Sequence, residues 1–281
     1  MKLHTLIKTI LTTLLLTFFI SACSSNSDTT TTTSNDNNKT INLDPLKSIT
    51  LTISNNSLNI NTSTTLNAIA TYEDKTTKDI TEEVEWISTD LNVIEISKRQ
   101  LKAKKENNII LQAKLNAITS NSVALEIYQE INGHRLPPEP NKALNNSTLL
   151  GIDVNKNGVR DDVERKIYFR YTRLIEQAYM MQDAKWYPQT LEDPVAAAAS
   201  KELEKENWDM AVCRVYLRIN NNLPKDSVDF MENAYFNTKE RMSAYIKFNE
   251  AMSGGVYHIP LLRDANKENC DFNITKMLEL E

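Results

Sequence analysis

The sequence predicts a multidomain protein in which a small all-β sandwich precedes a mostly α-helical domain. Between residues 46 and 128, short apolar runs alternate with polar residues at a period of two, which indicates strands with one buried face. Beyond the proline-rich run at 136–140, the apolar period lengthens to that of helices. The 281 residues, 41% hydrophobic and 25% charged, fit a globular chain of one or two domains.

Residues 1–22 have the order of an export signal. A short basic start precedes an apolar run at 10–20, and small residues follow it. Ile20-Ser21-Ala22-Cys23 resembles the lipobox of bacterial lipoproteins, and this resemblance implies cleavage before Cys23 and acylation of its thiol and amino group. Several acyl chains on one residue make membrane anchoring effectively permanent. The alternative is an ordinary secretory signal with a chance cysteine near its end.

Residues 23–43 are predicted to be the lipidated cysteine and a disordered tether. From Ser24 to Thr40 the chain holds no apolar residue, so it cannot bury enough surface to repay the entropy of ordering. Ser24, in place of an aspartate, resembles the default signal by which Gram-negative lipoproteins pass to the outer membrane. We therefore expect a lipid-anchored protein of the cell envelope, at the outer membrane.

Residues 44–129 are expected to form the sandwich. Four stretches resemble the group 2 bacterial immunoglobulin-like domains: Ile49-Thr50-Leu51, the run at 66–74, Asp79-Ile80-Thr81 and the run at 84–88. The resemblance implies an immunoglobulin-like spacer or adhesive unit on cell surfaces, without catalytic residues. Lys75 and Ala117 stand where that family commonly has glycine, so those turns are expected to differ. Trp86 is predicted to lie in the core between the sheets.

Residues 130–152 are interpreted as a proline-rich hinge, and residues 153–281 as a calcium loop followed by a helical domain. In the latter, apolar spacing and capping residues predict helices over four ranges: 163–181, 193–203, 208–219 and 226–251.

The strongest local signal is a candidate calcium loop. Oxygen-bearing side chains fall at its positions 1, 3, 5, 9 and 12, with Gly158 at position 6; they are Asp153, Asn155, Asn157, Asp161 and Glu164. This resembles an EF-hand loop. Arg160 occupies position 8, where paired EF-hands have an apolar residue, so the loop is more similar to the single loops of thrombospondin type 3 repeats. The prediction is one structural calcium site of weak, millimolar-range affinity; the alternative is a surface turn that caps the following helix.

Two cysteines remain once Cys23 is assigned to the lipid. In an oxidising compartment Cys213 and Cys270 are predicted to form a disulfide, which would tie the C-terminal tail to the third predicted helix. Two buried free thiols are the alternative.

Charge and motif content limit the possible functions. Loss of Lys2 and Lys8 with the signal moves the formal net charge from -5 to -7, which excludes nucleic acid as a partner class. His134 and His258 are interpreted as isolated loop residues, no nucleophile or phosphate-binding motif is present, and no catalytic residue is assigned. We expect a non-catalytic surface interaction or adhesion module with a calcium-stabilised domain junction and an unknown protein or glycan partner. The alternatives are a cell-envelope hydrolase with an unrecognised acidic site in the helical domain, and a purely structural spacer.

Overall fold

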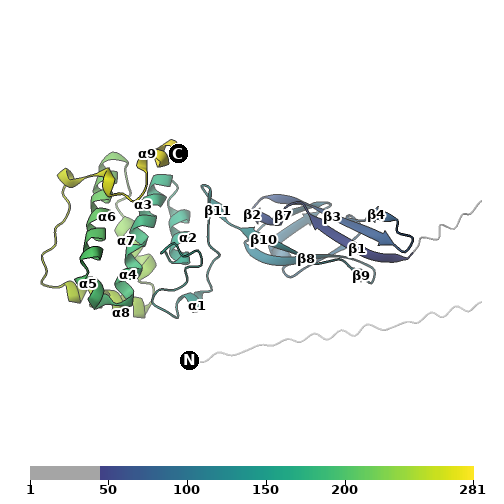
Figure 1. Ribbon diagram of the computed structural model, residues 1–281, viewed down its shortest axis with the longest axis horizontal. Coiled ribbons are helices and arrows are strands. Elements are labelled where there is room, and N and C mark those ends of the chain that lie inside the picture. Colours follow the sequence, from purple (N-terminus) through teal and green to yellow (C-terminus); the bar gives the residue numbers. More distant parts are fainter. Residues whose placement is uncertain (1–44) are drawn as a thin grey trace, which may run out of the picture. The chain divides into compact units, whose positions relative to one another are not determined.

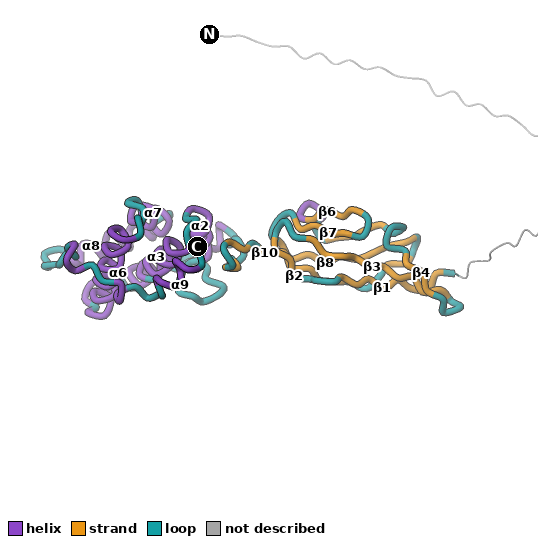
Figure 2. The backbone as a smooth tube through the Cα atoms, turned by 90° about the horizontal axis from the view of Figure 1, so that it is seen from above, coloured by secondary structure: helices purple, strands orange, loops and turns teal. Residues whose placement is uncertain are grey.

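Strands fill the first part of the described chain and helices the second (Figure 1). The computed structural model describes residues 45–281. The predicted signal peptide, Cys23 and the tether therefore lie outside the described residues. The chain mixes β and α elements, with the strands first, as Figure 2 shows by colour.

Within residues 45–281 the strands form two five-stranded sheets and one two-stranded hairpin. The first sheet contains β1 (Leu46–Ile53), β3 (Ser63–Tyr72), β7 (Gln100–Ala103) and β6 (Ile94–Ser97) in that order, with β4 (Thr77–Asp79) paired to β3. The second contains β2 (Ser57–Asn59), β10 (Val123–Tyr128), β8 (Asn107–Leu115) and β5 (Glu85–Ser88), with β9 (Ile118–Thr119) paired to β8. The hairpin joins β11 (Glu130–Ile131) to β12 (His134–Arg135), and a short 3-10 helix η1 (Leu91–Val93) precedes β6.

The period-two pattern of the sequence becomes the buried face of these strands. In β3, Leu66, Ala68 and Ala70 are buried, while the residues between them are partly exposed. Trp86 is half-buried and packs against both apolar clusters of the strand region, in agreement with its predicted core position. Lys75 has a φ of 69°, which explains why a glycine is expected there, because only glycine adopts that region without steric cost.

The helices follow between Lys142 and Glu279. They are α1 (Lys142–Asn145), α2 (Asp161–Arg170), α3 (Leu174–Ala184), α4 (Trp186–Glu192), α5 (Pro194–Ala199), α6 (Lys201–Asn220), α7 (Ser227–Tyr235), α8 (Lys239–Met252) and α9 (Ile274–Glu279), with 3-10 helices η2 (Leu262–Asp264) and η3 (Lys267–Asn269). The segment predicted as a hinge, 130–152, is therefore not structureless, because it contains β11, β12 and α1.

Two predicted helices were each wrong as a single element. The helix expected over 163–181 breaks between α2 and α3, where the Tyr171 backbone is extended and its carbonyl accepts a hydrogen bond from Gln177 Nε2 at 2.7 Å. The helix expected over 226–251 breaks between α7 and α8, and the Thr238 hydroxyl accepts from the Arg241 N–H to begin α8.

The boundaries of the middle helices also differ from the prediction. Asp193 caps α5, as expected, by accepting from the Ala196 N–H. However, α5 ends at Ala199, and the two ranges 201–203 and 208–219 belong to one continuous helix, α6. Ser200 causes the division, because its backbone is extended and its hydroxyl caps α6 through the Leu203 N–H.

Among the described residues, the helical core contains one buried carboxyl oxygen without a hydrogen-bond partner. Asp183 lies on α3 and is 1% exposed, and within the described residues its Oδ2 has no hydrogen-bond partner. Burial raises the pKa of Asp183 to about 7, and the more distant charge of Arg214 only partly opposes this rise.

The raised pKa of Asp183 predicts that stability falls as pH rises. Between the usual aspartate pKa and about pH 7, the folded state keeps a proton on Asp183 that the unfolded state has released. The free energy of unfolding therefore contains a contribution from this proton that is complete below the usual aspartate pKa and is lost as the pH rises to about 7. The loss is on the order of 4 kcal/mol. Asp183→Asn should be as stable as wild type at pH 4 and more stable at pH 8 in denaturant titrations. The exposed Asp229→Asn should follow wild type at both values, and equal stabilities of Asp183→Asn and wild type at pH 8 would contradict the prediction.

Candidate calcium site and an exposed apolar segment

The first half of the loop curls around the carboxylate of Asp153. Its Oδ1 accepts from the Asn157 N–H at 3.3 Å, and its Oδ2 accepts from the Gly158 N–H at 3.0 Å. Asn155 Oδ1 accepts from the same Asn157 N–H, and Asn157 Oδ1 accepts from the Val159 N–H at 2.9 Å. Gly158 has a φ of 85°, so the sharp turn at position 6 uses the freedom that the sequence motif predicts. The loop thus gathers the three N-terminal candidate ligands.

The second half brings the remaining two ligands to the same place. Asp161 accepts from the Val154 N–H through both carboxylate oxygens, at 3.1 and 3.2 Å. Glu164 Oε2 accepts from Asn157 Nδ2 at 2.7 Å and from Asn155 Nδ2 at 3.1 Å. All five predicted ligand residues are therefore joined through one short loop.

The site holds the carboxylates of Asp153, Asp161 and Glu164. Burial raises the pKa of Asp161 to about 6, and the carboxylates of Asp153 and Glu164 add to this rise. Over residues 45–281, none of these three carboxylates forms an ion pair with a lysine or an arginine. Asp161 and Glu164 are buried and Asp153 is half-buried, and carboxylate oxygens of this kind are donors that calcium prefers.

The donor set fits calcium through its mixture of carboxylates and amides. No group of three or more His, Cys, Asp or Glu side chains is arranged to hold a metal ion in the described part of the chain. A cation here therefore depends on the amide oxygens of Asn155 and Asn157 and on a backbone carbonyl, as position 7 of such loops supplies.

Arg160 fixes the loop to the helices. Its side chain is fully buried, and its guanidinium donates to the carbonyls of Ala234 and Tyr235 at the end of α7 and pairs with Asp162. The adjacent Val159 is buried in the helical core. The residue at position 8 thus contacts a helix, which explains why an arginine replaces the apolar residue of paired loops.

His134 was wrongly interpreted as isolated. Its Nε2 is hydrogen bonded to Glu164 Oε1 at 2.5 Å, and its ring stacks on Tyr168 with centroids 4.2 Å apart. The only sequence signal near it is Asn132-Gly133, a favoured two-residue hairpin turn that places His134 on β12. Nothing in the spacing along the chain could have indicated that this strand faces Glu164.

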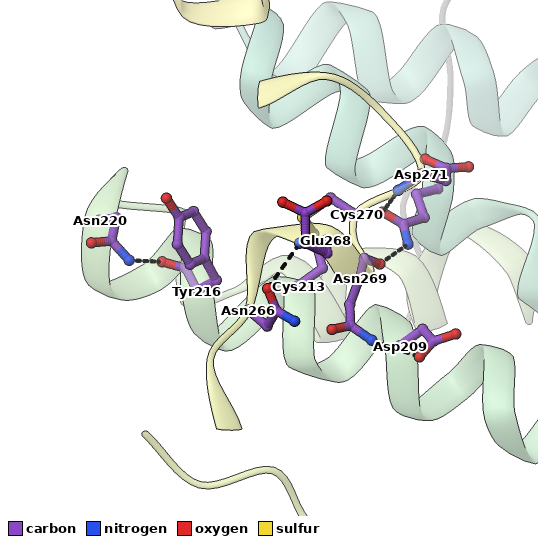
Figure 3. The surroundings of a disulfide bond; sticks show 10 residues. Asp209, Cys213, Tyr216, Asn220, Asn266, Glu268, Asn269, Cys270 and Asp271 are labelled. Atoms are coloured by element: carbon purple, nitrogen blue, oxygen red, sulfur yellow. Dashed lines mark hydrogen bonds between the residues drawn. A yellow bond between two sulfur atoms is a disulfide. The ribbon is translucent and has the colours of Figure 1, made fainter. Parts of the chain in front are cut away.

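The predicted disulfide is confirmed. The sulfur atoms of Cys213, on α6, and Cys270, in the tail, lie 1.99 Å apart (Figure 3). Beside it, Asn269 Nδ2 donates to Asp209 Oδ1 on α6, and Gln182 Nε2 donates to the Asn269 carbonyl. The tail is therefore joined to α6 and α3 by covalent and hydrogen bonds.

An acidic cleft of about 470 Å³ lies beside the disulfide. Its lining includes four carboxylates, Glu206, Asp209, Glu268 and Asp271. Three of them are bonded to neighbours: Asp209 to Lys205, Asp271 to Lys185, and Glu206 to Gln189. These bonds hold the carboxylates in place and do not set a free acid opposite a free base.

Residues 256–262 form an exposed apolar segment that follows α8 and ends at the first residue of η2. Val256 is 87% exposed, Ile259 82% and Leu262 75%. Tyr257 and Pro260 of the same segment line a hollow of about 330 Å³, opposite Trp208 on α6. Large aliphatic side chains are thus gathered at high exposure on this segment.

Comparison with protein-family models and with curated proteins found no match for this chain. Within residues 45–281, no helix is both long enough and apolar enough to cross a membrane.

The loop geometry predicts calcium-dependent stability. For a dissociation constant in the range 10⁻⁴ to 10⁻³ M, 10 mM calcium should raise the free energy of unfolding by about 1–3 kcal/mol. Asp153→Asn keeps the hydrogen-bond acceptor but removes one charge, and should weaken or abolish the gain. Thermal melts of residues 24–281 in calcium and in chelator measure it, with Asp229→Asn as the matched control. Identical wild-type melts with and without calcium would rule out the site.

Proposed function

We propose that this chain is a membrane-anchored lipoprotein of the cell envelope that acts as a non-catalytic surface interaction or adhesion module. An immunoglobulin-like sandwich over residues 44–129 presents a helical domain over residues 153–281, and calcium stabilises their junction. The observation that carries the interaction role is the apolar segment 256–262, whose aliphatic side chains are exposed to an extent that a free surface does not favour.

The strand order supports the immunoglobulin-like assignment. The order β1-β3-β7-β6 corresponds to strands A, B, E and D of that fold, and β10-β8-β5 corresponds to G, F and C. Trp86 lies on β5, the strand that carries the core tryptophan in immunoglobulin domains.

The contacts made by the histidines and by the carboxylates of the acidic cleft support a non-catalytic role over the hydrolase alternative. His134 is engaged by Glu164, and His258 is exposed in the segment 256–262. Three of the four carboxylates of the acidic cleft, Glu206, Asp209 and Asp271, are bonded to lysine, asparagine or glutamine side chains. No specific observation therefore favours a second function.

The anchor is tested through Cys23. In a Gram-negative host, Cys23→Ala should leave the chain unlipidated, and the protein should leave the detergent-extracted membrane fraction, because nothing else in the lipobox can accept the diacylglyceryl group. Ser24→Ala, one residue further on, should stay in that fraction. Stable membrane retention of Cys23→Ala would contradict the proposed anchor.

The interaction role is tested through the apolar segment. Lipid-free residues 24–281 on a resin should retain a protein or glycan from envelope extract, and the double variant Val256→Ser, Ile259→Ser should lose most of it. The matched control is Val195→Ser, Ile219→Ser, which changes the same residue types at other exposed positions. Equal retention by both double variants, or none by the wild type, would count against the proposal.

A further inference from the structure

The carboxylate of Glu164 contacts two segments of the chain. Oε2 accepts from the amides of Asn155 and Asn157, within the loop. Oε1 accepts from Asn155 at 3.4 Å and is hydrogen bonded at 2.5 Å to His134, which lies outside the loop on the β11–β12 hairpin. The side chain of Glu164 is fully buried, so its orientation is set by these two sides.

Helix α2 holds His134 by a pair of side chains at helical spacing. Glu164 and Tyr168 are four residues apart, so they lie on one face of the helix. The imidazole stacks on the Tyr168 ring with an interplanar angle of 10°, while its Nε2 reaches Glu164. Stacking fixes the plane of the imidazole, and the hydrogen bond fixes its direction.

The hairpin also contacts the break between α2 and α3. Asn132 Nδ2 donates to the Thr172 carbonyl at 2.9 Å and to Gln177 Oε1 at 3.1 Å. On its other side, the hairpin is tied to the strands, because the Glu130 N–H donates to Asn59 Oδ1 and Arg135 pairs with Glu126. The hairpin thus links the last strand of the second sheet to the helix that carries Glu164.

We propose that His134 is a positioning residue for the calcium loop and that calcium binding is coupled through it to docking of the hairpin on α2. Groups that hydrogen-bond a metal-binding carboxylate fix its orientation, and their loss typically lowers metal affinity about 10–100-fold. Coupling between two equilibria is reciprocal, so calcium strengthens hairpin docking by the same factor that docking strengthens calcium binding. The site then works as a calcium-dependent lock on the connection between strands and helices. This inference rests on the calcium site of the proposed function.

The test measures calcium affinity and hairpin opening separately. Lipid-free residues 24–281 are titrated with calcium chloride by calorimetry, and amide hydrogen exchange of residues 130–136 is followed by mass spectrometry in calcium and in chelator. In the wild type, calcium should slow exchange of the hairpin about tenfold or more. His134→Phe keeps an aromatic ring on Tyr168 but lacks Nε2, so it should weaken calcium binding about tenfold and remove the slowing. His134→Gln restores a donor and should recover part of both.

Two further variants separate coupling from local damage. Asp229→Asn changes an exposed side chain on α7, outside the loop and the hairpin, and should leave both measurements unchanged. Asn132→Gly removes the bonds to Thr172 and Gln177, keeps the positive φ of 52° favourable, and touches no calcium ligand. It should nevertheless weaken calcium binding several-fold, an effect that only the coupling predicts.

The outcomes distinguish the two proposals. If the wild type binds calcium but the hairpin exchanges equally with and without it, or if His134→Phe binds calcium as tightly as the wild type, the coupling is refuted while the calcium site stands. If the wild type binds no calcium at all, the site itself is refuted, and the inference falls with it.

Discussion

The buried carboxylate of Glu164 is the group that the centre of the structure is arranged to satisfy. An ionised carboxylate removed from water loses several kcal/mol of solvation, so it requires donors or a cation on every open side. It receives an imidazole from the hairpin and two amides from the loop, and no lysine or arginine of the described residues pairs with it. Glu164 therefore combines local contacts from the loop, whose two asparagines lie seven and nine residues before it, with one contact from His134, which lies 30 residues before it.

Arg160 and Arg241 do not pair with the carboxylates of the loop, because their donors are engaged elsewhere. Arg160 lies next to Asp161 in the chain, but its donors go to Asp162 and to carbonyls of α7. Arg241 is equally buried and donates to five neutral oxygens of Asn145, Asn146, Leu149, Thr148 and Asn237. Gly151, with a φ of 74°, passes between the two arginines, where a Cβ would lie 2.4 Å from Arg160 Cδ. Arg160 and Arg241 thus hold helices and their connections together, whereas the carboxylates of Asp153, Asp161 and Glu164 bind groups of the loop.

Sequence patterns predicted what depends on neighbours along the chain. Alternation located β1 and β3, the cap at Asp193 located α5, and ligand spacing located the loop, because each is set by local backbone geometry. The same patterns missed the break at Tyr171, since the hydrogen bond that stabilises it comes from Gln177 and the apolar stripe continues across it. They missed His134 for the same reason, because its role exists only once β12 lies against α2. Contacts between segments that are distant along the chain cannot be predicted from the pattern of a single sequence.

The position of the loop between unlike elements argues that the proposed calcium ion would act on structure and not as a sensor. In sensor EF-hands the ion changes the angle between two helices that flank a loop, and paired loops transmit that change. Here the loop leads into α2, whereas the preceding helix α1 ends at Asn145 and is held by Arg241. The residue at position 8, which would join a partner loop, is instead fixed to the end of α7. An ion bound in such a loop has no pair of helices to reorient. What it can change is the strength with which the loop, the hairpin and α2 are held together.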